Sequence, residues 1–120
     1  MQASPYTHFD PRALLTDLFD NHEIVRTVLA AFGDWRSTAE GELRTAAEAG
    51  NAPQLARITH ALRGTLAQIH ATAGADMARA LEQRCKSPAA GFVPGPSDIG
   101  ALLQELGAVA GEVADYLERN

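Results

Sequence analysis

Apolar residues recur every three or four positions through most of this chain, which is the spacing of helices with one buried face. The clearest stripe lies within residues 55–81. Its first half consists of Leu55, Ile58, Leu62, Leu66 and Ile69. The pattern changes between residues 68 and 73, so we expect a bend there and a second helix that folds back beside the first.

Capping residues mark where the other helices begin and end. Asp10, which precedes a proline, begins a short helix, and Asn21 begins a long helix that ends at Gly50. Pro53 opens the helix of the clearest stripe, and Pro96 opens the last one. These elements predict an all-α fold, an antiparallel up-and-down four-helix bundle with a short extra N-terminal helix.

The composition supports a single helical domain. The chain has 120 residues, of which 46% are hydrophobic and only 6% aromatic. Abundant alanine and the lack of long β-branched runs favour closely packed helices over a sheet. A chain of this length can bury one core. We expect a flexible lead-in at residues 1–9, a bundle domain at residues 10–120, and a monomer.

Charge and cysteine content restrict the partners and the compartment. The formal net charge of −5 argues against binding to nucleic acid or to an anionic membrane, which would need a basic patch. Cys85 is the single cysteine, so an internal disulfide is impossible and a reducing compartment fits best. The sequence shows neither a signal peptide nor an apolar run of the roughly 20 residues that cross a bilayer. We therefore expect a cytoplasmic protein.

His60 lies almost opposite the apolar stripe at about 100° per residue, and therefore on an outward face. Gly64 and Ala67 fall close to it, and Arg57 and Arg63 flank it. A glycine inside a helix costs about 1 kcal/mol, so Gly64 indicates that a partner approaches here. The arginines favour a neutral, nucleophilic imidazole and could stabilise an attached phosphoryl group. The alternative is an ordinary surface histidine.

The sequence gives little support for a site that binds a metal ion, a cofactor or a nucleotide. His8 and His22 are interpreted as surface residues, and His60 and His70 point about 80° apart, so they cannot face one ion from a single helix. The chain has no Glu-x-x-His pair, no P-loop and no dinucleotide-binding glycine motif. We therefore expect no metal site, no cofactor and no nucleotide site. A metal- or haem-binding bundle enzyme is a further alternative.

The sequence HALRGT at residues 60–65 resembles the His-x-Leu-Lys-Gly-Ser signature of histidine-containing phosphotransfer (HPt) domains. The resemblance extends more loosely over nearly the whole chain, through the order of the helices and the Asn-Ala-Pro turn before the histidine. It implies an up-and-down bundle with an exposed, phosphorylated histidine midway along one helix. It also implies a phosphoryl carrier without its own ATP site, and therefore not an enzyme.

The resemblance assigns roles to individual residues. His60 becomes the phosphorylated residue, Arg63 takes the place of the family's lysine beside the phosphate, and Gly64 gives a partner access. Glu82 stands where the family often has an acidic or amide side chain that can bind the imidazole and fix its tautomer. Gln68 is a further polar neighbour. The alternative for Gln68, Arg57, Arg63 and Glu82 is plain solvated surface.

The sequence departs from the family at three positions after the histidine helix, one of which is Ala78, where cysteine is common. His70 replaces a usual glycine, so the bend after this helix could differ. Gly74 stands where leucine is common, so we expect the return helix to pack more thinly.

The expected partners are response-regulator receiver domains and a sensor histidine kinase, including hybrid kinases. Mg²⁺ is expected on the receiver alone. The docking surface would centre on His60, Gly64 and Ala67 with apolar residues of the long helix, while Phe32 and Trp35 are interpreted mainly as core. A binding module that docks on a receiver or kinase without phosphotransfer is the main alternative. A stand-alone protein is favoured over a piece of a larger kinase.

Overall fold

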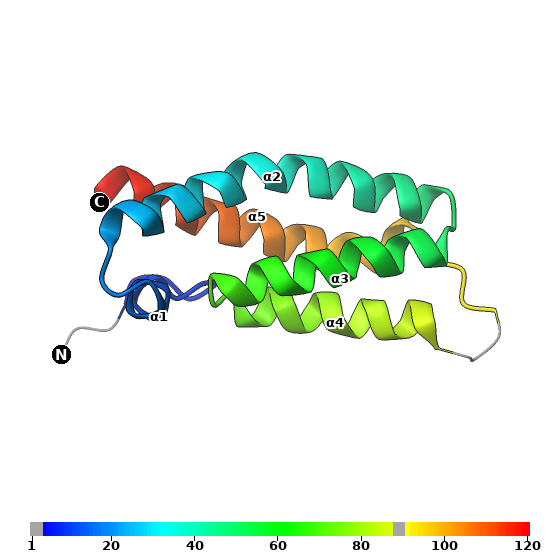
Figure 1. Ribbon diagram of the computed structural model, residues 1–120. Coiled ribbons are helices and arrows are strands. Elements are labelled where there is room, and N and C mark those ends of the chain that lie inside the picture. The colour runs from blue at the N-terminus through cyan, green and yellow to red at the C-terminus, as the bar shows by residue number, and fades with distance from the viewer. Residues whose placement is uncertain (1–3, 88–90) are drawn as a thin grey trace.

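The computed structural model describes residues 4–87 and 91–120, and these residues form five helices (Figure 1). The helices are α1 (Pro11–Asp17), α2 (His22–Glu48), α3 (Ala52–Gln68), α4 (Thr72–Lys86) and α5 (Pro96–Arg119). The four long helices run up and down beside one another, with α1 across one end. The described parts of the chain contain no strand. The predicted four-helix bundle with a short N-terminal helix is confirmed.

Local hydrogen bonds explain where the helices begin and end. The side chains of Asp10, Asn21 and Asn51 each accept a backbone N–H from the first turn of α1, α2 and α3. These bonds satisfy donors that a helix leaves without a partner. Gly50 ends α2 with a φ of +64°, which glycine adopts without strain. The caps at Asp10 and Asn21 and the stop at Gly50 are therefore confirmed.

The apolar stripes meet along the axis of the bundle. The largest fully buried side chains are Leu14, Leu29, Leu43, Leu55, Leu62, Leu66, Ile69, Ile99, Leu106, Val25, Val109 and Val113. Every member of the stripe predicted at residues 55–69 is buried. Because this stripe faces the core, the opposite face of α3 is turned outward. None of the helices in the described residues is long and apolar enough to cross a membrane.

The bend between α3 and α4 occupies residues 69–71, inside the predicted interval. His70 has a φ of +59°, which lies in the left-handed region that glycine favours. Its Nε2 atom lies 2.6 Å from Oδ2 of Asp17, which connects this turn to α1. The turn sends α4 back along α3, and this pairing brings residues of the two helices together at the site described below.

Gly74 is buried where α4 approaches its neighbours most closely. A Cβ atom at this position would lie 3.2 Å from Cδ1 of Leu66 and 3.5 Å from Cγ of Glu105. The missing side chain therefore leaves no gap. The expectation that the return helix packs more thinly here is wrong, because a Cβ atom at this position would already contact Leu66 and Glu105.

The expected lead-in, residues 1–9, is described from residue 4 onward, and there it contacts α5. Phe9 is buried in the core. The hydroxyl of Tyr6 donates to Asp115 at 2.8 Å, and Nδ1 of His8 lies 2.8 Å from Oε2 of the buried Glu105. Residues 1–3 lie outside the described residues. Packed structure thus begins before residue 10, and the flexibility of the segment stays a prediction.

Candidate functional site

His60 lies on the outward face of α3, near the middle of the helix. Its side chain is 61% exposed. One turn further along, Gly64 is also exposed, and a Cβ atom added there would meet no heavy atom within 4 Å. The packing of the bundle therefore does not require a glycine at this position. Gly64 instead leaves the surface beside the imidazole open.

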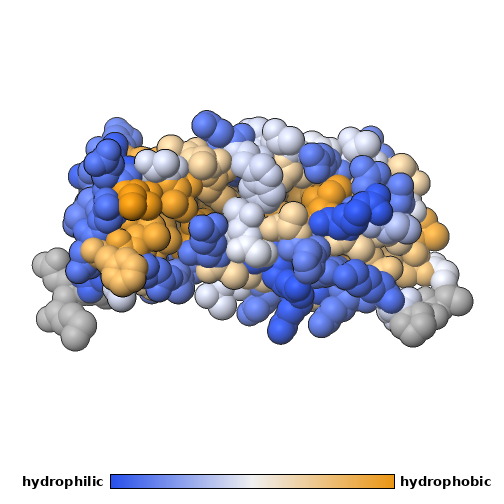
Figure 2. All heavy atoms as spheres, viewed as in Figure 1, coloured by the Kyte–Doolittle hydropathy of each residue, from blue (hydrophilic) through white to orange (hydrophobic). Residues whose placement is uncertain are grey.

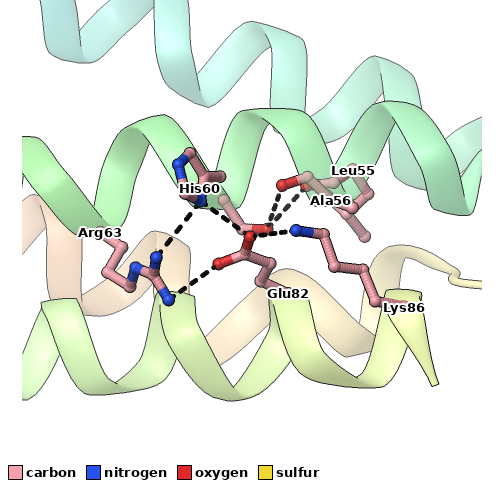
Figure 3. A network of polar contacts seen from close by, with 7 residues as sticks. Leu55, Ala56, His60, Arg63, Glu82 and Lys86 are labelled. Carbon is pink, nitrogen blue, oxygen red and sulfur yellow. Dashed lines mark hydrogen bonds and ion pairs between the residues drawn. The ribbon is translucent and has the colours of Figure 1, made fainter.

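A buried carboxylate lies beneath this exposed ring. Oε2 of Glu82, on α4, is 2.9 Å from Nδ1 of His60 (Figure 3). Glu82 is only 3% exposed. An ionised carboxylate can only accept hydrogen bonds, so Nδ1 carries the hydrogen atom and Nε2 keeps a free lone pair. The second ring nitrogen points away from α4 in Figure 3 and is therefore accessible to a partner.

Arg63 contacts both members of this pair. Its Nη2 atom lies 3.3 Å from Nδ1 of His60, and its Nη1 atom lies 3.3 Å from Oε1 of Glu82. Nδ1 cannot accept a hydrogen from Arg63 while it donates its own to Glu82. The contact of Nδ1 with Glu82, at 2.9 Å, is shorter than its contact with Arg63, at 3.3 Å, and the carboxylate is negatively charged. Nδ1 therefore donates its hydrogen to Glu82. The guanidinium then acts on the ring through its charge.

Lys86 adds a further cation to the carboxylate. Its Nζ atom lies 2.8 Å from Oε2 of Glu82, one turn along α4. The hydrogen bond from Lys86 lowers the pKa of Glu82, and the bond from His60 and the charge of Arg63 add to this effect against the cost of burial. Oε1 has no hydrogen-bond partner among the described residues. Glu82 is therefore ionised at neutral pH, although its side chain is buried.

Two hollows open along α3, and one of them includes His60 in its lining. A cavity of about 530 Å³ is lined by Pro53, Ala56, Arg57, His60, Cys85 and Lys86. A groove of about 310 Å³ between α2 and α3 is lined by Val28, Ala31, Phe32, Trp35, Thr65, Gln68 and Ile69. Figure 2 shows apolar surface gathered over the first half of α2 and the last half of α3, which contribute most of this groove. His60 thus lines one of these hollows, and the other lies further along α3.

The structure brings together three of the residues selected from the sequence, namely His60, Arg63 and Glu82. Arg57 and Gln68 are exposed on α3, and within the described residues neither makes a hydrogen bond or ion pair with His60. Arg57 shares the larger cavity with the imidazole, and Gln68 lines the groove. The functional roles of all five remain predictions.

Two further residues were placed differently by the fold or were missed. Phe32 is buried, as expected, but Trp35 is only partly buried and lines the groove. Lys86 was missed at the sequence level. The available signal was its position four residues after Glu82, the spacing at which helical side chains of opposite charge pair.

The described residues contain no group of three or more histidine, cysteine, aspartate or glutamate side chains that could hold a metal ion. The expectation that the protein needs no cofactor stays a prediction.

Comparisons with known proteins agree with this fold. The family model of the Hpt domain matches residues 23–118. The crystal structure of histidine-containing phosphotransfer protein B (HptB) from Pseudomonas aeruginosa PAO1 is similar, with a TM-score of 0.81 and 20% sequence identity. The match covers 98% of this chain and 99% of that chain. A search of curated proteins gave no match. At this identity the structural likeness concerns the fold alone.

Proposed function

The chain belongs to the Hpt domain family, which acts in histidine phosphotransfer within phosphorelays, and we propose that His60 is the residue that carries its phosphoryl group. The observation that carries this proposal is the contact between Nδ1 of His60 and the buried Oε2 of Glu82. This contact holds one ring nitrogen in its protonated form and leaves the other free to attack phosphorus.

The proposed reaction requires no proton transfer. Nε2 of His60 attacks the phosphorus of an aspartyl phosphate on a receiver domain, in line with the bond that breaks. The N–P bond forms, the aspartate leaves as a carboxylate, and the ring keeps its Nδ1 hydrogen. The ring gains positive charge next to Glu82, which is ionised and 2.9 Å away. Reversal of the same steps delivers the phosphoryl group to a second receiver.

Arg63 and Gly64 support the two ends of this reaction. The guanidinium of Arg63 is within 3.3 Å of the imidazole and its side chain is 38% exposed, so it can turn toward a phosphoryl group on Nε2. Gly64 leaves the neighbouring surface open, which lets the active site of a receiver approach the ring. The receiver and its own Mg²⁺ supply most of the charge stabilisation in the transition state.

The proposed partner surface extends from His60 across Gly64 and Ala67 to the apolar groove between α2 and α3. An apolar groove further along α3 would bury part of a docked receiver and help to hold its aspartate in place. A sensor histidine kinase, including a hybrid kinase, is the proposed source of the phosphoryl group. We propose that the chain is a carrier without its own ATP site.

The experiment is transfer of labelled phosphate from a phosphorylated receiver domain to the purified protein. The wild-type chain should take up acid-labile label, and His60→Gln should take up none. His70→Gln and His22→Gln, which change histidines outside the site, serve as matched controls and should retain the label. Label on His60→Gln would overturn the proposal. A wild-type chain that binds receivers but never takes up label would instead support the docking module without phosphotransfer.

A further inference from the structure

Two donors share a single oxygen atom in this site. Oε2 of Glu82 lies 2.8 Å from Nζ of Lys86 and 2.9 Å from Nδ1 of His60 (Figure 3). The two donors come from different helices, and the carboxylate lies between them. The side chain of Lys86 is 62% exposed, whereas that of Glu82 is 4% exposed. The exposed ammonium therefore contacts the imidazole indirectly, through a buried group.

The shared oxygen has a consequence for the protonation of His60. A carboxylate favours a second proton on a neighbouring imidazole, because it stabilises the positive ring. An ammonium on the same oxygen reduces this effect in two ways. It takes part of the negative charge of the carboxylate, and its own charge disfavours a second cation nearby. Both effects keep the imidazole neutral, and a neutral ring retains the lone pair on Nε2.

The other charged groups around the ring act in the same direction or carry no charge. From α3, Arg63 faces the ring directly and Arg57 faces it across the cavity. From α4, Cys85 lines the same cavity, and burial raises the pKa of its thiol, so it stays uncharged. Glu82 is thus the anion of this site within the described residues, and Lys86 is its closest cation.

We propose that Lys86 is a positioning residue for phosphotransfer, which acts through the shared oxygen of Glu82 to keep His60 neutral and nucleophilic near neutral pH. This inference rests on the proposed function of His60. It goes beyond a structural ion pair, because Lys86 and the imidazole bind the same oxygen atom of Glu82. A merely structural role would therefore leave the pH dependence of transfer unchanged.

The test is the single-turnover rate of label transfer from a phosphorylated receiver, measured as a function of pH. Lys86→Gln should move the acid limb of the profile to higher pH, since one partly exposed charge near the ring is lost. On that limb the variant should be roughly three-fold slower than the wild type. Lys86→Arg keeps the charge and should restore the wild-type profile. Arg79→Gln removes a charge from the exposed side of α4 and should leave the profile unmoved.

The effect of Lys86→Gln in a Glu82→Gln variant shows whether Lys86 acts through Glu82. In Glu82→Gln the shared carboxylate is gone, so adding Lys86→Gln should move the acid limb clearly less than it does in the wild-type background. A shift of equal size in both backgrounds would mean that Lys86 acts directly on the ring or on the phosphate, and this would overturn the proposal. An acid limb that is identical in Lys86→Gln and the wild type would also overturn it.

Chemical modification gives an independent readout on the folded protein. Lys86 is the only lysine in the sequence, so an amine-selective acylating reagent modifies it and the α-amino group alone. Acylated wild type should reproduce the profile of Lys86→Gln, and acylated Lys86→Arg should not shift. Uptake of label by the unmodified wild type separates the two hypotheses. No uptake overturns the proposed function, whereas normal uptake with an unmoved limb overturns only the role of Lys86.

Discussion

Nδ1 of His60 lies 2.9 Å from Oε2 of Glu82, although the two residues belong to different helices and stand 22 positions apart in the chain. The contact depends on the turn at residues 69–71, which lays α4 beside α3. It joins an exposed ring to a buried carboxylate. The tautomer of the His60 ring is therefore set by the packing of the bundle as well as by its own helix.

Removal of the carboxylate should slow phosphotransfer. In Glu82→Gln the side-chain amide can turn either its oxygen or its NH₂ group toward Nδ1, so the ring is no longer held in one tautomer. Loss of a hydrogen bond to a charged group costs about 1.5–3 kcal/mol, which corresponds to roughly ten-fold or more in rate. Single-turnover transfer from a phosphorylated receiver measures this effect. An unchanged rate in a folded Glu82→Gln variant would show that Glu82 does not hold the ring.

The same carboxylate should make stability depend on pH in the acid range. The pKa of Glu82 lies below its ordinary value of 4.5 in the folded chain, chiefly because Lys86 donates a hydrogen bond to it. A lowered pKa contributes stability above pH 4.5, and this contribution is lost as the pH falls through the folded value. The difference in unfolding free energy between wild type and Glu82→Gln, measured by urea denaturation, should shrink as the pH falls. A difference that grows on acidification would contradict the assignment.

Larger side chains at Gly64 and at Gly74 should have opposite effects on the stability of the fold. Gly64→Gln meets open space and replaces glycine inside a helix, so stability should rise by roughly 0.5 kcal/mol while label transfer falls. Gly74→Leu would contact Leu66 and Glu105, so stability should fall by about 1–3 kcal/mol. Thermal unfolding and transfer rates measure both effects. If Gly64→Gln transfers phosphate as fast as the wild type, the open surface is not needed for docking.

The N-terminal segment should stabilise the fold most strongly at low pH. The hydrogen bond to Glu105 raises the pKa of His8 above its ordinary value of 6.5, so the folded chain holds the proton more tightly. This contribution is present below pH 6.5 and is lost as the pH rises through the raised value. The stability difference between wild type and His8→Gln should therefore shrink above pH 6.5. A difference that is the same at all pH values would show that the ion pair does not contribute.

The helices, their caps and the orientation of His60 could be predicted because they follow from local rules. Side-chain oxygens of Asp10 and Asn21 cap the helices that follow them, and the buried stripe at residues 55–69 determines the outward face of α3. None of these inferences requires knowledge of a distant residue.

Contacts between helices were harder to predict because they depend on register and closeness of approach. Arg57 and Arg63 are both three positions from His60, yet only Arg63 also pairs with Glu82 in the described residues. Lys86 reaches the site through α4, and the periodicity of α4 alone does not say which residue of α3 it faces. Tyr6 and His8 lie in a segment without helical periodicity, so their contacts with α5 could not be predicted from the spacing of hydrophobic residues.

Location of the phosphate on the wild-type chain tests the central claim most directly. After transfer from a phosphorylated receiver, nuclear magnetic resonance of protein with ¹⁵N-labelled histidine can show which ring nitrogen is bonded to phosphorus. We predict a bond to Nε2 of His60, with the hydrogen retained on Nδ1 beside Glu82. Phosphorus on Nδ1 of His60, or on any of the other three histidines instead of His60, would contradict the account.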